Sequence, residues 1–354
     1  MNIILSRTSQ SDVSIFSRFQ NHLFYKLNVG AVGFYRVEYD DELRNALKVD
    51  SMMVRDRLQL QSDTFALCKA GYIPMTNYLD TVALYKHETN YAVLSDVLAN
   101  LSEIGKVCWN LDEATRASFS KWRIEFLQNA KNHCGFDKKE FEDHSTSLLR
   151  SSVVGTLGGL GDSETLKWCE SAFEKHVSGE KLIPGDLRNP VFGTIAAHAK
   201  NVETIETLIS LWEKNSDSVE EQQNIERAIG LTKNKETIDV VMKWCAEKVR
   251  TCNKPYTYVY VCAGSLLGCE TFWNLVKSDI EAIKTEFTGF ARQAIIARTI
   301  KYFGTQDKHD EIKKFFEANP MVGAERAIPQ MLENIQNKAT ILERDGDNIK
   351  NYFK

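Results

Sequence analysis

The chain has 354 residues, of which 26% are charged and 43% hydrophobic, and its formal net charge is −4. This is the composition of an ordinary globular protein. The acidic balance argues against a nucleic-acid partner, because proteins that bind nucleic acids usually carry a basic domain. No apolar run approaches the roughly 20 residues that cross a membrane, and the apolar stretch at the N-terminus is too short for a signal peptide. We therefore expect a cytoplasmic protein without a membrane partner.

The first 40 residues differ from the rest of the chain. Segments 3–6, 23–28 and 33–39 are short, rich in aromatic and branched residues and partly alternating, which is the pattern of β-strands. Three strands make a poor domain by themselves, since a sheet needs a partner to cover its apolar face. We expect residues 1–40 to be the terminal strands of an incomplete β-sandwich. Their exposed edges would favour self-association of the chain through this segment.

From residue 41 to residue 354 the apolar residues recur at helical spacing. One such stripe consists of Leu94, Val97, Leu98, Leu101, Ile104 and Cys108. Steps of three or four residues place these side chains on one helix face, which needs a neighbouring helix. Helices of about 12 to 18 residues with short connections predict antiparallel helix pairs stacked in a row. No strict repeat period is present, so the predicted fold is mostly α, an irregular α-solenoid of the HEAT or armadillo kind.

The sequence shows no complete catalytic or metal site. The nearest match to the zinc motif HExxH is His87-Glu88-Thr89-Asn90-Tyr91, where a tyrosine replaces the second imidazole ligand. We interpret this segment as a solvated helix C-terminus. The eight cysteines are scattered without a CxxC pair, and we interpret them as buried, reduced thiols. The sequence leaves open a triad built from distant cysteine, histidine and acidic residues.

Two further patterns have simple structural interpretations. The run GTLGGLG at 155–161 lacks the lysine and the hydroxyl residue of a phosphate-binding P-loop, and no strand precedes it. We interpret it as a turn between two helices. The charged run KNKE at 233–236 has mixed sign, which is typical of a solvated surface.

Several segments resemble a known family. The segment KLNVGAVGFYRVEYD at 26–40 resembles the stretch that ends the β-sandwich and opens the helical C-terminal domain in zinc aminopeptidases of the HExxH and GxMEN type. The segments RLQLQSDTFAL at 57–67, DLRNPVF at 186–192 and AERAI at 324–328 resemble the same family in the same order. Within the family, the chain is most similar to the cytosolic puromycin-sensitive aminopeptidases.

The resemblance implies a division of labour. A full enzyme of this family carries its zinc, its HExxH motif and the GxMEN segment in a separate catalytic domain, and none of these motifs is present here. The helical domain forms a concave bowl over the active site and leaves room for the distal end of a peptide. We therefore expect a C-terminal fragment or truncated relative without catalytic or metal-binding residues, whose partners are peptides and the parent catalytic domain. The alternative is a helical scaffold that binds peptides or proteins on its own.

Positive side chains in such a bowl would suit the carboxylate at the end of a peptide. No binding residue is carried over by a motif, but four arginines in family-like or later helical segments are candidates. They are Arg188, Arg292, Arg298 and Arg326. A structural or surface role is the alternative for each of them.

Overall fold

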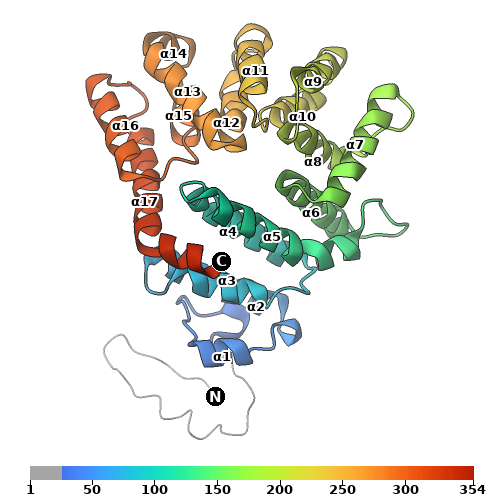
Figure 1. Ribbon diagram of the computed structural model, residues 1–354, viewed down its shortest axis with the longest axis vertical. Helices are drawn as coiled ribbons and strands as arrows, with labels where there is room; N and C mark the ends of the chain where they lie inside the picture. The colour runs from blue at the N-terminus through green and yellow to red at the C-terminus, as the bar shows by residue number, and fades with distance from the viewer. Residues whose placement is uncertain (1–25) are drawn as a thin grey trace, which may run out of the picture.

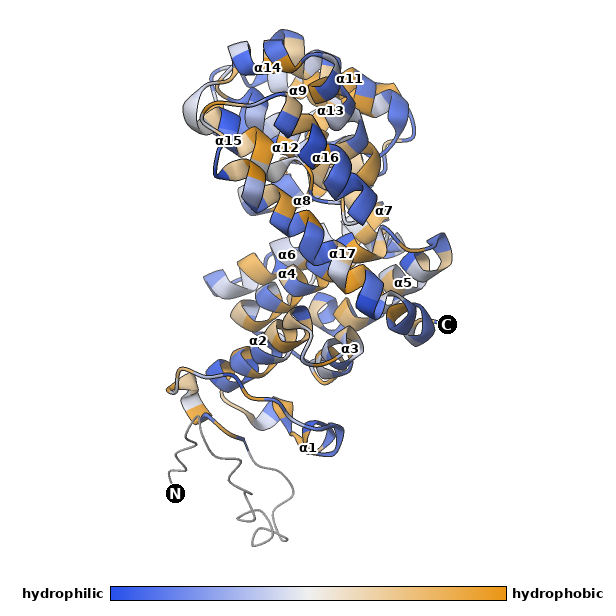
Figure 2. Cartoon of the chain, turned by 90° about the vertical axis from the view of Figure 1, so that its left-hand side faces the viewer, coloured by the Kyte–Doolittle hydropathy of each residue, from blue (hydrophilic) through white to orange (hydrophobic). Residues whose placement is uncertain are grey.

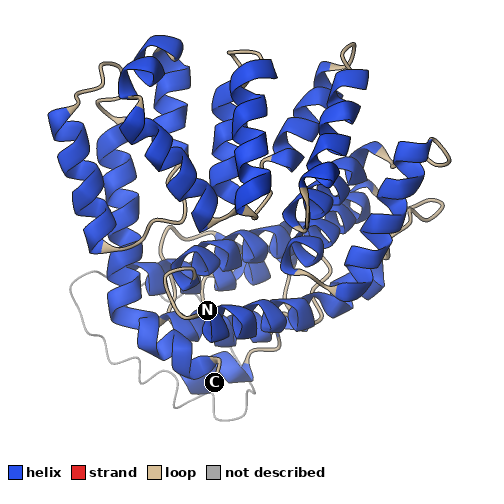
Figure 3. Cartoon of the chain, turned by 45° about the horizontal axis from the view of Figure 1, so that its top comes forward, coloured by secondary structure: helices blue, strands red, loops and turns tan. Residues whose placement is uncertain are grey.

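The computed structural model describes residues 26–354, apart from the side chains of Phe290, Ala297 and Arg298. Within that part the chain consists of helices joined by loops and contains no strand (Figure 3). None of the described helices is both long enough and apolar enough to cross a membrane. The prediction of a mostly helical protein is therefore confirmed, and the architecture is that of a helical solenoid.

The helices follow one another in the order η2 (Val29–Ala31), α1 (Asp41–Ala46), η3 (Val49–Ser51), α2 (Val54–Ala70), α3 (Met75–Ala83), α4 (Tyr91–Cys108), α5 (Glu113–Cys134), α6 (His144–Leu160), α7 (Ser163–Ser178), α8 (Gly185–Ala197), α9 (Val202–Lys214), α10 (Val219–Ile229), α11 (Lys235–Lys248), α12 (Lys254–Gly264), α13 (Leu266–Ser278), α14 (Ile280–Glu286), α15 (Gly289–Arg298), α16 (Gln306–Ala318) and α17 (Ala327–Tyr352).

Local sequence signals explain where many of these helices begin. Asn90 caps α4, because its side-chain oxygen accepts a hydrogen bond from the amide of Ala92 at 3.1 Å. Asp162 caps α7 in the same way, through the amide of Thr165 at 3.0 Å. Pro329 lies in the first turn of α17, as the sequence predicts, where its missing N–H costs nothing. All six residues of the predicted stripe on α4 are buried.

The inner helices form a ring. Helices α4, α6, α8, α10, α12, α15 and α17 contact one another in that order, and α17 then contacts α4 and α3 again. Helices α7, α9, α11 and α16 lie on the outside of this row, whereas α5 packs against α4 and α6 (Figure 1). The last helix is therefore packed against the first part of the chain. Arg344 of α17 fixes this closure by donating a hydrogen bond to the carbonyl of Cys68 at 2.7 Å.

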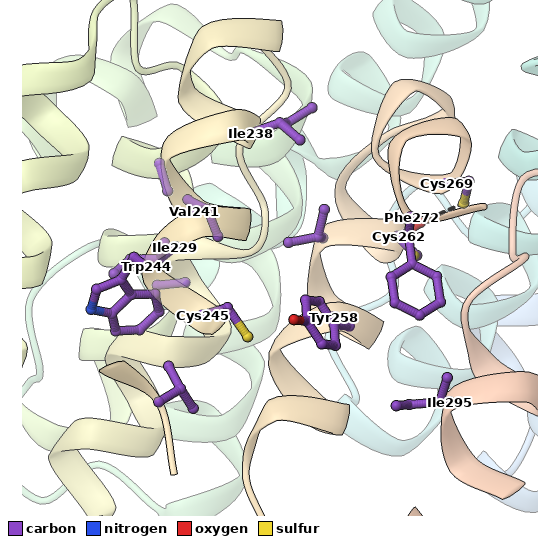
Figure 4. Packing of buried hydrophobic residues seen from close by; sticks show 14 of the residues in the cluster. Ile229, Ile238, Val241, Trp244, Cys245, Tyr258, Cys262, Cys269, Phe272 and Ile295 are labelled. Atoms are coloured by element: carbon purple, nitrogen blue, oxygen red, sulfur yellow. Dashed lines mark hydrogen bonds between the residues drawn. The ribbon is translucent and has the colours of Figure 1, made fainter. Parts of the chain in front are cut away.

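The apolar residues of the ring fall into two clusters. One cluster joins α2 to α6, and the other joins α7 to α16. Helices α6 and α17 contribute to both, which joins the two halves. Figure 4 shows part of the second cluster, where Trp244, Tyr258 and Phe272 pack between neighbouring helices. Along α17, hydrophobic residues alternate with hydrophilic ones (Figure 2), as expected for a helix with one buried face.

The strand predicted at 33–39 is not observed. Val37 and Tyr39 are buried, as an alternating strand requires, but they belong to an apolar cluster whose other described members come mainly from α2 to α6. The amide of Val37 donates to Asp63 of α2 at 3.2 Å, and Arg36 forms an ion pair with the same carboxylate at 3.2 Å. Alternation of apolar and polar residues indicates that every second side chain is buried, but it does not identify the element that buries it. Segment 3–6 and the first half of segment 23–28 lie outside the described residues.

The glycine-rich run at 155–161 is helical, and the prediction of a turn was wrong for all but its last residue. Helix α6 continues to Leu160, and only Gly161 ends it, with a φ of 88°. The glycines serve close packing. A Cβ on Gly158 would lie 2.0 Å from the hydroxyl oxygen of Thr194 on α8. The helix tolerates these residues because α6 and α8 pack with their backbones close together.

Candidate functional site

The largest described cavity lies inside the ring, near the C-terminal ends of the inner helices. It measures about 640 Å³, and its walls come from the second halves of α4 and α6, from α8, from the first half of α5, from the end of α12, and from the loops after α10 and α15. The C-terminal end of a helix carries partial negative charge on its free carbonyl groups. Several basic side chains point at these carbonyls, and they give the cavity its charge.

Arg123 is the basic residue with the fewest partners. Its guanidinium lies 5.5 Å from the centre of the Phe119 ring, and none of the described carboxylates forms an ion pair with it. Its Nε atom is buried without a hydrogen-bond partner. Burial lowers the pKa of Arg123 to about 10, so the side chain is still charged at neutral pH. A buried donor without an acceptor costs free energy, which an anionic ligand would recover.

Lys233 and His198 lie on the opposite wall. The Lys233 ammonium donates to the carbonyl of Gly159 at 3.0 Å, and His198 Nε2 lies 2.8 Å from the carbonyl of Gly158. Burial lowers the pKa of Lys233, and burial together with the Lys233 charge lowers the pKa of His198. The histidine is therefore neutral at neutral pH, and the lysine supplies the positive charge. The prediction of a solvated run at 233–236 was wrong for Lys233, which is half-buried.

The remaining polar groups of the cavity leave it with excess positive charge. Arg116 is held by the carbonyl of Leu111 at 2.5 Å and by the ring of Trp109, not by a carboxylate. Glu113 is the one acidic residue of the lining, and it is exposed. The side-chain oxygen of Asn189 is buried without a donor. The cavity can thus bind an anionic group and accept one hydrogen bond, which are the needs of a peptide's C-terminal end.

Of the four arginines singled out from the sequence, the three whose side chains are described lie elsewhere. Arg188 forms an ion pair with Glu221 at 2.7 Å. Arg292 donates to the backbone carbonyls of Phe287, Val322 and Lys284. These two side chains hold neighbouring segments together.

Arg326 is exposed at the start of α17, and the side chain of Arg298 lies outside the described residues. Neither Arg188, Arg292 nor Arg326 lines the central cavity. Their role as peptide-carboxylate contacts stays a prediction.

The segment that resembles HExxH has a structural role. Glu88 is buried and forms an ion pair with Arg57 of α2. The same carboxylate accepts hydrogen bonds from the amides of Thr89 and Asn90 at 3.1 and 2.8 Å. The prediction of a solvated helix end was therefore wrong for Glu88. Among the described residues, no three histidine, cysteine, aspartate or glutamate side chains gather closely enough to hold a metal ion.

The cysteines are free thiols, and all except Cys252 are buried. Cys262 and Cys269 lie on the neighbouring helices α12 and α13 (Figure 4), where Cys269 Sγ donates to the carbonyl of Cys262 at 3.0 Å. Burial raises the pKa of the Cys68, Cys108 and Cys169 thiols to about 12. Such thiols are protonated and poor nucleophiles.

One signal in the sequence could have identified Arg123. It lies four residues after Phe119 and next to Trp122, so helical spacing places it beside an apolar stripe. A charged residue in that position is either buried or reaches past the stripe. No such signal predicts the position of Lys233, because Gly159, whose carbonyl it contacts, is 74 residues away in the chain.

The fold and the cavity define a closed helical solenoid with positive charge at its centre. The model of the ERAP1-like C-terminal domain family matches residues 24–337, and the chain belongs to this family. It is 27% identical to Aminopeptidase M1-A of Oryza sativa, covering 93% of this chain and 38% of that protein. It is 25% identical to the puromycin-sensitive aminopeptidase of Caenorhabditis elegans, covering 93% of this chain and 36% of that protein. The chain is thus an aminopeptidase C-terminal domain that spans little more than a third of these relatives.

Proposed function

We propose that the chain encloses peptide substrates as the C-terminal part of a zinc aminopeptidase that removes N-terminal residues from peptides. The family match and the names of the relatives support this assignment. The zinc and the catalytic residues would belong to the catalytic part of the parent enzyme. Residues 1–40 would complete a β-sandwich there, residues 41–354 would form the enclosing domain, and the whole would act in the cytoplasm.

The central cavity would hold the C-terminal carboxylate of the peptide. The observation that carries this proposal is Arg123 Nε, a buried donor that lacks an acceptor. Lys233, whose ammonium group donates to the backbone carbonyl of Gly159, would provide a second positive charge on the opposite wall. Charge-assisted hydrogen bonds of this kind are stronger than neutral ones. The free acceptor of Asn189 would take the last peptide N–H.

A binding measurement tests the role of the cavity. Fluorescence anisotropy would compare a labelled peptide that ends in a free carboxylate with the same peptide as a C-terminal amide. We expect the acid to bind about tenfold more tightly, since a hydrogen bond to a charged group contributes about 1.5–3 kcal/mol. Arg123→Met should abolish that preference, whereas the exposed control Lys314→Met should keep it. Equal binding of acid and amide to the unaltered chain would refute the proposal, and loss of the preference in Arg326→Met alone would favour the arginine predicted from the sequence.

A mixing assay tests the parent activity. The chain would be added to a separately produced N-terminal portion of a related aminopeptidase, and the release of fluorophore from amino-acid amides would be followed. Activity in the mixture alone would support a domain that completes the enzyme. Silence in the mixture and in each part would favour the helical scaffold that binds peptides on its own. Activity of the chain alone, sensitive to a zinc chelator, would contradict both.

A further inference from the structure

A second cavity lies on the other side of α4, where α17 closes the ring against α2 and α4. It measures about 290 Å³, which is near the lower end of the range for small-molecule sites. Its walls come from α2, the start of α3, the last turns of α4, the residues after α15, and α17. The cavity therefore exists only because the last helix returns to the first ones.

The floor of this cavity is apolar. It is formed by buried side chains from the three helices α3, α4 and α17, namely Met75, Ile104, Val107, Met331, Ile341 and Ile349. The opposite side is polar and open to solvent. Lys69, Asn334 and Asn337 are exposed there and form the mouth. A ligand that fits this cavity needs an apolar body and a polar end.

Four lysines and one glutamate line the cavity, so positive charges outnumber negative ones by three. Glu103 is already paired with Lys106. Lys338 donates to the carbonyls of Lys301 at 2.6 Å and Ile300 at 3.5 Å and has no carboxylate partner among the described residues. The side chain of Lys301 forms neither a hydrogen bond nor an ion pair within the same part of the chain. Two half-buried ammonium groups thus face the cavity without a counter-charge.

We infer that this cavity binds a small organic anion of the fatty-acid class, with its carboxylate between Lys301 and Lys338 and its hydrocarbon body on the apolar floor. The anion would supply the missing counter-charge, and the hydrocarbon would replace water on the buried side chains. This site is separate from the central cavity, and it does not depend on the proposed binding of peptides.

The chemistry of the walls selects this ligand over two others. Inorganic phosphate would satisfy the lysines but would leave the apolar floor in contact with water. A peptide end would bring backbone amide groups onto the floor, where no described polar side chain could bond them, and an unpaired buried amide is unfavourable. A hydrocarbon chain has no such groups.

Isothermal titration of the full chain with decanoate tests the inference. Decanoate should bind, whereas decanol and inorganic phosphate should bind at least about tenfold more weakly. Decanol lacks the carboxylate, and phosphate lacks the hydrocarbon chain. Lys301→Met should weaken decanoate binding about tenfold. Because Lys301 has no partner to lose, this change should leave thermal unfolding unaltered, and Lys301→Arg should restore binding. Lys314→Met, on the exposed face of α16, is the matched control.

The protonation of Lys338 gives an independent readout. Burial, together with the nearby charge of Lys106, lowers the pKa of Lys338 to about 8. A bound carboxylate favours the charged form, so binding should take up protons near pH 8, and affinity should fall as the pH rises through this value. Titrations in buffers of different ionisation enthalpy measure this uptake.

Equal binding of decanoate and decanol, or unchanged decanoate binding in Lys301→Met, would overturn the inference. So would displacement of decanoate by a peptide acid but not by a longer fatty acid. Arg123→Met should leave decanoate binding unchanged, which separates this site from the proposed peptide site. Failure of the peptide proposal would therefore leave this result standing, and the reverse also holds.

Discussion

Arg150 connects the end of α5 to α6 from a position with no exposure to solvent. Its Nε and Nη2 atoms donate to the carbonyl of Cys134 at 3.1 and 2.8 Å. Its Nη1 atom donates to Glu142 Oε1 at 2.6 Å, and the side chain of Glu142 is only 3% exposed. A single guanidinium group therefore links the C-terminal end of α5 and the loop after it to α6.

Arg150→Met keeps the volume of the side chain and removes its charge. Glu142 would then lose its counter-charge and keep the hydrogen bonds from the Ser147 hydroxyl and the Lys139 amide. The carbonyl of Cys134 would lose the two bonds from Arg150. Removing one member of a buried ion pair costs about 3–5 kcal/mol. We expect a loss of this size in the free energy of unfolding. In the double variant Arg150→Met/Glu142→Gln no carboxylate is left unpaired, so the combined loss should be smaller than the sum of the single losses by about 1–3 kcal/mol.

Urea unfolding followed by far-UV circular dichroism measures these differences, with Lys314→Met as a surface control. The m-value should stay constant, because the substitution changes stability and not the surface exposed on unfolding. A loss below about 1 kcal/mol in Arg150→Met would refute the reasoning, since a surface ion pair contributes no more than that. So would strict additivity in the double variant.

The same pair predicts a dependence on pH. The hydrogen bond from Arg150 lowers the pKa of Glu142 to about 2, whereas an unperturbed glutamate titrates near about 4.3. Because the folded pKa is depressed, the stabilisation is complete above the unfolded pKa and is lost as the pH falls through the folded value. The difference in stability between the unaltered chain and Glu142→Gln should therefore shrink between about pH 5 and about pH 2. A difference that stays constant over this range would contradict the assignment.

Two other substitutions test the packing of the ring. Gly268→Ala would place a Cβ 2.1 Å from the carbonyl oxygen of Val261, and we expect urea unfolding to show a loss of about 3 kcal/mol or more. The control Gly159→Ala meets no atom within 4 Å and should stabilise α6 by about 0.5–1 kcal/mol; a similar effect of both changes would disprove the packing argument. Arg344→Met removes the bond to the Cys68 carbonyl and the partner of a buried aspartate. It should cost about 3 kcal/mol and speed hydrogen exchange in the last turns of α17, and unchanged exchange there would contradict its role in closing the ring.

The sequence by itself determined the class of fold and the family. The periodicity of three and four residues in α4 and α17 is a local property, because an apolar stripe needs a neighbour whatever that neighbour is. The family was identified from the segment at 26–40 and from the later segments that resemble the same family. The sequence pattern gave a wrong prediction of secondary structure where a different kind of element buried the same side chains. Val37 and Tyr39 alternate like a strand, but they are buried in the helical cluster of α2 to α6.

The tertiary structure alone decided where the binding sites lie. The central cavity brings Arg123 of α5 close to Lys233 after α10, and the second cavity brings Lys69 close to Lys338. No local rule predicts these encounters, because they depend on the accumulated rotation of the helices and on the return of α17 to the start of the chain. Burial then decides the charge that each site presents. A lysine is an ordinary surface residue in the sequence, and it becomes a binding group only where the fold removes both its water and its counter-charge.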